Sequence, residues 1–141
     1  MLLAEVPAHG GEGYGELMHN RRVQLSADAR RVCRQGACYC DLFWECGERG
    51  VDVECQSTSH HFGAKSSARD ADRATALQMM GIEVIQLTYT QMADASRFEL
   101  FSRFLAEKIG AEYREKNERE RRAQRELRAK VLVSWESLPN V

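Results

Sequence analysis

Apolar and polar residues alternate most clearly between Val51 and Gln56, as in a strand that buries one of its faces. A second run of strand-forming residues, 38–44, comes just before it and alternates more roughly. Gly47 and Gly50 flank a short polar turn between the two runs, and glycine suits the backbone of a hairpin loop. The pattern therefore predicts a β-hairpin over residues 38–56.

The register of this hairpin decides which side chains meet. If Trp44 pairs with Val51, Asp41 lies opposite Glu54, with their Cβ atoms about 4.5–5.5 Å apart on one face. Like charges at that distance destabilise a sheet, so a chain that places them there usually has a cation to put between them. Gln56 projects from the same face as Glu54. The spacing predicts a divalent-cation site on Asp41 and Glu54, with Gln56 beside it.

Helical periodicity, capping residues and short apolar runs predict further elements on both sides of the hairpin. These are a helical turn over residues 1–6, a strand over 21–25, and helices over 27–34, 67–80 and 97–109. Ser26 is the expected N-cap of the helix over 27–34, and Gly36 is its expected end. Ser67 and Asp70 have the spacing of a capping box at the start of the next helix.

The run Ile82–Thr88 is almost entirely apolar, which is typical of a central strand covered by helices on both faces. Because it follows a helix directly, we expect it to run parallel to an earlier strand and to share one sheet with the hairpin. These elements predict an α/β domain with a mixed central sheet flanked by helices.

Composition changes sharply after Gly110. Residues 111–130 contain eight Arg or Lys and five Glu, and thus carry a net charge of +3. Two interpretations fit: a solvated helix that projects from the domain, or an arm that binds nucleic acid, a protein partner or a second copy of the chain. We therefore expect a domain over residues 1–110 and a charged helical extension over 111–141.

The whole chain has 141 residues, enough for one domain with a core, and its net charge of −1 gives no overall basic signature for nucleic acid. No apolar run approaches the roughly 20 residues that span a membrane, and no basic and apolar leader begins the chain. We expect a cytoplasmic protein without a membrane partner. Cys38 and Cys40, two of five cysteines, are expected to be reduced and buried; a zinc pair is the alternative.

The series of residues from Asp41 onward resembles the PD-(D/E)xK nuclease superfamily, whose members share the restriction-endonuclease-like fold. In that pattern one acid begins a strand, and a second acid, any residue and a lysine follow on the paired strand. Asp41, Glu54 and Gln56 stand at these places, with glutamine for lysine. The chain is also similar, over roughly residues 12–110, to the bacterial branch related to very-short-patch repair endonucleases. The matching residues are Asp41–Trp44, Val51–Glu54, His61, Asp70, Arg73, Leu77, Gly81 and Thr88.

This resemblance implies a metal-dependent DNA endonuclease. Asp41 and Glu54 would hold Mg²⁺, for which Mn²⁺ can substitute, helped by a backbone carbonyl such as that of Cys55. Gln56 would orient the attacking water, and His61 would shuttle a proton or position that water. A surface-loop role is the alternative for His61.

Three arginines are candidates for contacts with the DNA backbone, Arg73 from the matched helix and Arg30 and Arg31 from a local basic cluster. Arg73, Arg30 and Arg31 would contact phosphates. The alternatives are an ion pair with Asp70 for Arg73, and a solvated face for the other two.

Two departures from the family pattern support a second hypothesis. The family carries an upstream helix with a further Glu at the metal site, and residues 1–20 contain no equivalent, so we expect this helix to be truncated. Gln56 also lacks the charge of the usual lysine. The second hypothesis is an inactive nuclease-like module that binds nucleic acid or regulates another protein.

Overall fold

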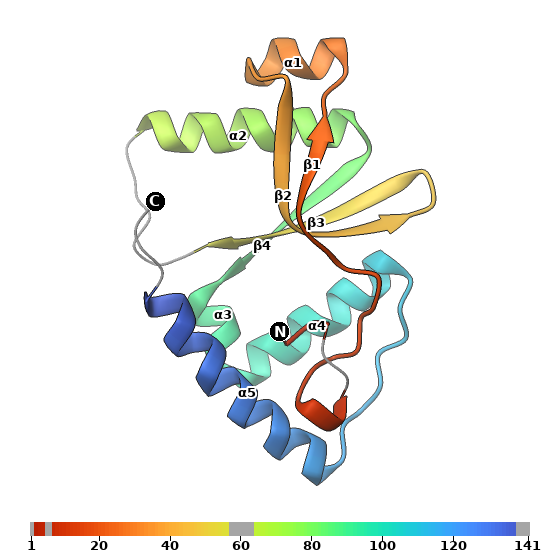
Figure 1. The fold of residues 1–141 in the computed structure, drawn as a ribbon, viewed down its shortest axis with the longest axis vertical. Helices are drawn as coiled ribbons and strands as arrows, with labels where there is room; N and C mark the ends of the chain where they lie inside the picture. Colours follow the sequence, from red (N-terminus) through yellow and green to blue (C-terminus); the bar gives the residue numbers. More distant parts are fainter. Residues whose placement is uncertain (1, 5–6, 57–63, 138–141) are drawn as a thin grey trace. The chain divides into compact units, whose positions relative to one another are not determined.

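The structure is a computed structural model that describes residues 2–4, 7–56 and 64–137 (Figure 1). Its elements are, in chain order, the 3₁₀ helix η1 (Pro7–His9), β1 (Met18–Gln24), α1 (Ala27–Cys33), β2 (Ala37–Cys46), β3 (Arg49–Gln56), α2 (Ala64–Met79), β4 (Ile82–Thr88), α3 (Tyr89–Ala93), α4 (Ala95–Ile109) and α5 (Glu118–Ser137). They form two compact units. The sheet unit is Met18–Gln86, and the helical unit combines Met1–Leu17 with Leu87–Val141.

The four strands form one sheet in the order β1-β2-β3-β4. Both β1–β2 and β2–β3 are antiparallel, and the sheet is mixed, so β4 runs parallel to β3 after the crossover through α2. The predicted hairpin, the parallel strand and their common sheet are confirmed. The mixed α/β class with flanking helices is confirmed with them.

The prediction of a central position for Ile82–Thr88 is wrong. As β4, this strand lies at one edge of the described sheet. Its side chains explain the difference, because Glu83 and Gln86 are exposed although the neighbouring positions are apolar. Two polar positions on one strand suit an edge, where one side of the strand meets water.

The core of the sheet unit lies between the strands and helices α1 and α2. Its buried members are Leu25, Ala29, Cys38, Cys40, Phe43, Ala76, Leu77 and Ile82. Cys38 and Cys40 behave as small apolar residues here, and all five cysteines are free thiols, as expected. Gly50 approaches this core so closely that a Cβ atom there would lie 2.6 Å from the Phe43 ring, which explains the glycine at this position.

The ends of α1 and α2 differ in part from the prediction. Ser26 caps α1 as expected, accepting a hydrogen bond from the Ala29 amide at 3.4 Å. The helix ends at Arg34, in the left-handed conformation with φ 61°, so the assignment of its end to Gly36 is wrong. Helix α2 begins at Ala64, which places Ser67 inside the helix, so the predicted capping box is wrong as well.

The helical unit packs the N-terminal residues against α4 and α5. Leu2 and Leu3 are buried, and their carbonyls accept hydrogen bonds from the amides of Glu12 (2.7 Å) and Tyr14 (2.9 Å). Residues 2–4 form a turn, and η1 follows; no helix is assigned to these described residues, where the last turn of a helix was expected. At Gly10 a Cβ atom would lie 2.4 Å from the Ala123 carbonyl of α5, so a larger residue would push these segments apart.

The charged C-terminal helix is α5, and it begins later than residue 111. Asn117 and Glu120 form a capping box: the Asn117 side chain accepts from the Glu120 amide at 2.9 Å, and Glu120 accepts from the Asn117 amide at 3.0 Å. The helix packs on η1 and α3, which a helix projecting into solvent would not do. In the described part of the chain, no helix is long and apolar enough to cross a membrane.

Candidate functional site

The hairpin register places Asp41 beside the end of β3. Trp44 pairs with Val51, as predicted, and Leu42 pairs with Val53. One residue further on, the Asp41 carboxylate Oδ2 accepts a hydrogen bond from the Cys55 amide at 3.1 Å, where a regular ladder would use a backbone carbonyl. Asp41 therefore joins the two strands through its side chain, next to Glu54.

Two further acids lie on β3, and both are buried. Asp52 is fully buried and Glu54 is 8% exposed. They alternate with Val51 and Val53, so both project from the same side of the strand. Asp52 was not among the residues predicted for the site. Its signal in the sequence was its position two residues before Glu54.

In the described part of the chain, the guanidinium that contacts these acids is that of Arg73 on helix α2. Its Nη1 lies 2.5 Å from Glu54 Oε1 and its Nη2 lies 3.9 Å from Asp52 Oδ2. Arg73 also donates a hydrogen bond to the backbone carbonyl of Tyr39 on β2. The sequence suggested a pair with Asp70 or a phosphate for Arg73, and missed Glu54 because the two residues are distant in the chain.

The negative charge of the acids in this cluster exceeds the positive charge of Arg73. Asp41, Asp52 and Glu54 carry three negative charges when ionised, against one positive charge. Within the described ranges, neither oxygen of Asp52 has a hydrogen-bond partner, and Glu54 Oε1 meets Arg73 as an ion pair without a directed hydrogen bond. Buried carboxylate oxygens without hydrogen bonds are rare and costly.

The acids respond by holding protons more tightly. Burial, with the neighbouring Asp52 carboxyl next, raises the pKa of Glu54 to about 7. Burial, with the Glu54 carboxyl next, raises the pKa of Asp41 to about 7, and burial raises the pKa of Asp52. Asp41 lies at an exposed position on β2, where water screens its charge more than that of Glu54, which is buried.

Arg73 and the cysteines follow the same electrostatics. Burial lowers the pKa of Arg73, but Glu54 and Asp52 more than offset this effect, so that its pKa is raised. Burial, with the nearby carboxylates next, raises the pKa of Cys55 to about 12 and moves that of Cys40 further in the same direction. Both shifts disfavour the thiolate, which is the nucleophilic form of cysteine.

The remaining predicted residues lie in three places. Gln56 is half-buried at the end of β3, at the next position after Glu54 on the same face. Arg30 and Arg31 are exposed on α1, and Arg30 Nε donates to the Leu25 carbonyl at 3.0 Å. His61 lies outside the described residues, as does His60. The structure thus brings Asp41, Glu54 and Arg73 together, and Gln56 is the next residue on the same face of the strand.

A search of the described residues finds no group of three or more His, Cys, Asp or Glu side chains arranged to hold a metal ion. Comparisons of the chain with family models, with curated proteins and with solved structures find no match. The site must therefore be interpreted from its own chemistry.

Proposed function

We propose that the sheet unit is a metal-dependent DNA endonuclease-like domain of restriction-endonuclease-like fold, which hydrolyses phosphodiester bonds. The observation that carries the proposal is the convergence of Asp41, Asp52 and Glu54 from two paired strands, with buried oxygens that lack hydrogen bonds. Acids held at this cost, with raised pKa values, are typical of sites that bind a cation or move a proton.

The donor chemistry fits Mg²⁺ or Mn²⁺. Both ions prefer carboxylate oxygens, and Mg²⁺ is commonly held by one or two carboxylates while it keeps several waters. Asp41 and Glu54 would hold the ion, and the Cys55 carbonyl would help. A bound ion would lower the pKa of a water and stabilise charge on the attacked phosphate.

Arg73 supports the proposal because it supplies the positive charge that Gln56 cannot. In the resembled pattern a lysine follows the second acid on the same strand, and here a guanidinium from α2 reaches that acid instead. A guanidinium can bind a phosphate oxygen in a bidentate manner and stabilise the charge that develops during hydrolysis. Gln56 would orient water by hydrogen bonding, and Arg30 and Arg31 would contact the DNA backbone from α1.

One observation favours the second hypothesis, an inactive nuclease-like module. Arg73 already lies 2.5 Å from Glu54, the acid expected to hold the metal. A cation built into the site satisfies part of the charge that would otherwise attract Mg²⁺. The domain would then bind nucleic acid without cutting it.

Plasmid nicking with and without Mg²⁺ or Mn²⁺ tests the proposal. We expect weak, metal-dependent nicking by the wild type, and a loss of roughly 100-fold or more in Glu54→Ala, because small misplacements at a reacting centre already cost that much. Glu48→Ala removes an acid from the exposed hairpin turn and should nick like the wild type. Equal nicking by wild type and Glu54→Ala would refute the mechanism. Retained DNA binding without nicking by the wild type would favour the inactive module.

A further inference from the structure

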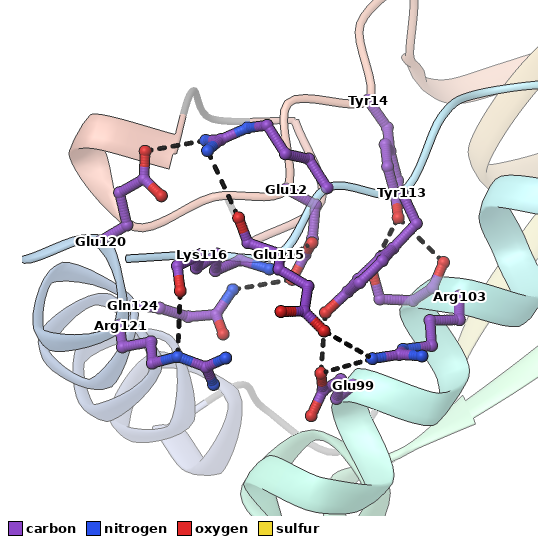
Figure 2. Close-up of polar contacts among 12 residues, drawn as sticks. Glu12, Tyr14, Glu99, Arg103, Tyr113, Glu115, Lys116, Glu120, Arg121 and Gln124 are labelled. Carbon is purple, nitrogen blue, oxygen red and sulfur yellow. Dashed lines mark hydrogen bonds and ion pairs between the residues drawn. The ribbon is translucent and has the colours of Figure 1, made fainter. Parts of the chain in front are cut away.

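A second polar site lies within the helical unit. A pocket of about 200 Å³ opens between the first turn of α4, the segment before α5 and the inner face of α5. Figure 2 shows the side chains around it, including Glu12, Lys116, Arg121 and Gln124. Four of its lining residues are basic, namely Lys116, Arg121, Arg125 and Arg128, and two are acidic, Glu12 and Glu99.

The acids of this pocket are already neutralised by fixed partners. Glu12 accepts from Lys116 Nζ at 2.7 Å and from Gln124 Nε2 at 2.8 Å. Glu99 accepts from Arg103 Nη2 at 3.1 Å and from the Tyr113 hydroxyl at 2.9 Å (Figure 2). Among the described residues, Lys116 is the basic lining group that forms an ion pair with one of these acids, while Arg121 acts on Glu99 through space.

Three arginines remain, and they make the pocket positive. Arg121 uses its Nε to donate to the Lys116 carbonyl at 3.1 Å, which leaves the charge of its guanidinium without an acidic partner among the described residues. Among the described residues, the ion-pair partner of Arg125 is Glu118, at 3.7 Å, and both side chains are exposed. Water screens such a pair, so it neutralises little charge.

Arg128 is the deepest of the three and is 7% exposed. Its Nε donates to the Met92 carbonyl at 3.0 Å, and its guanidinium stacks over the Phe98 ring at 5.4 Å. No carboxylate in the described part of the chain pairs with it. Glu12 and Asp94 act on it only through space, so this buried cation lacks a direct ion pair, which an anion in the adjoining pocket would provide.

From this geometry we infer that the helical unit binds a phosphate group in this pocket, held by Arg121, Arg125 and Arg128. The ligand is a small one. Pockets that enclose whole drug-sized molecules or nucleotides have volumes of about 300 Å³ or more, and this one is smaller. Arginine forks match the oxygens of a phosphate, and Ser96 of α4 adds a hydroxyl donor to the lining.

Titration of the full chain with inorganic phosphate, at constant ionic strength set with chloride, tests the inference. Calorimetry or NMR should give a dissociation constant of about 1 mM or tighter, which is modest for a small ligand with few contacts. The double variant Arg121→Gln/Arg125→Gln should bind at least tenfold more weakly. Its matched control is Arg119→Gln/Arg122→Gln, which removes the same charge from exposed positions of the same helix outside the pocket.

The outcomes distinguish a specific phosphate site from nonspecific attraction of phosphate to the positive charge of the helix. Unchanged phosphate binding by the control variant supports the site, whereas equal weakening by both double variants would overturn it. The inference would also be overturned if the wild type bound no phosphate at a concentration 50-fold above the expected dissociation constant, about 50 mM. Titrations with adenosine and AMP identify the form of phosphate that is bound. If AMP binds more tightly than inorganic phosphate, the ligand is a phosphate monoester, and equal affinity of the two identifies free phosphate as the ligand. Adenosine as tight as AMP would overturn recognition of the phosphate.

Discussion

The two units bury charge in opposite ways. In the helical unit, Glu12 and Lys116 have side chains that are 3% and 7% exposed, lie 2.7 Å apart, and are completed by Gln124. In the sheet unit, Asp52 is fully buried with no hydrogen bond to either oxygen among the described residues, and Arg73 contacts two of the three clustered acids, Asp52 and Glu54. The first arrangement satisfies its charges, and the second leaves negative charge in excess.

Their acids differ accordingly. Hydrogen bonds from Tyr113 and then Arg103 lower the pKa of Glu99 in the helical unit, and the Arg114 side chain lowers that of Glu120. In the sheet unit, burial raises the pKa of Glu54 to about 7. A satisfied network adds stability, whereas excess buried charge costs stability and is typical of functional sites. The pairing of the buried charges, and not their number, therefore distinguishes a structural cluster from a candidate functional site.

The largest effect is expected where the satisfied cluster is broken. Lys116→Met leaves Glu12 as a buried charge without its counter-ion, which should lower the free energy of unfolding by about 3–5 kcal/mol. Urea denaturation followed by circular dichroism measures this change. Lys130→Met, at an exposed position of α5, is the control and should change stability by less than about 0.5 kcal/mol. A loss below about 1 kcal/mol in Lys116→Met would show that the pair is solvated.

The pH dependence of the sheet unit should have the opposite sign to that of an ordinary carboxylate. The folded chain binds the Glu54 proton more tightly than the unfolded chain, so this group stabilises below its ordinary pKa near 4.5, and the stability is lost as the pH rises to about 7. We expect a higher melting temperature at pH 5.5 than at pH 7.5, from a difference of at most about 3 kcal/mol. Below this window, Glu99 and Glu120 lose their own stabilising interactions.

Two variants test the origin of that slope. Glu54→Gln removes the titrating carboxyl and should flatten the rise between pH 7.5 and pH 5.5, while Glu48→Gln, in the exposed hairpin turn, should keep it. A melting temperature that falls on acidification across this window in the wild type would contradict the raised pKa of Glu54.

Asp52→Asn should change the free energy of unfolding by a smaller amount than Lys116→Met and in the opposite direction. The substitution keeps the size of the side chain and removes a buried charge without hydrogen bonds, while Arg73 keeps Glu54 as a partner. We expect it to raise the free energy of unfolding at pH 7.5 by about 2 kcal/mol. Asp72→Asn, exposed on α2, should be neutral. A destabilised Asp52→Asn protein would mean that Arg73 satisfies Asp52 despite their separation of 3.9 Å.

The sequence allowed the local features of the site to be predicted, because they depend on alternation and turns. The pairing of Trp44 with Val51, and with it the meeting of Asp41 and the end of β3, follows from a hairpin of this length. Arg73 could be placed on a helix but not against Glu54, since that contact depends on how α2 packs on the strands. The edge position of β4 was missed for the same reason: strand order is a tertiary property that apolar content does not fix.

Capping shows a different kind of failure. The pattern Ser67-x-x-Asp70 was taken as a capping box and lies inside α2, whereas Asn117-x-x-Glu120 was overlooked and caps α5. Both sequences satisfy the same local rule. Whether such a pattern caps a helix depends on where that helix begins, and this depends on the packing of the preceding segment.

The smallest expected effect is the one that distinguishes a metal site from a site filled by its own arginine. If Asp41 and Glu54 hold Mg²⁺, the ion binds only the folded chain and stabilises it by about 1.4 kcal/mol at ten times its dissociation constant. Glu54→Gln should abolish this shift of the melting temperature. Arg73→Gln should enlarge this shift of the melting temperature at low Mg²⁺, because a neutral side chain no longer competes for Glu54, which Arg73 meets at 2.5 Å.

The same variant should lose nicking activity if Arg73 stabilises the reacting phosphate. Tighter Mg²⁺ binding together with lost cleavage would assign both roles to Arg73, whereas an unchanged melting temperature with Mg²⁺ in both Arg73→Gln and the wild type would exclude a metal at these acids and favour the inactive module.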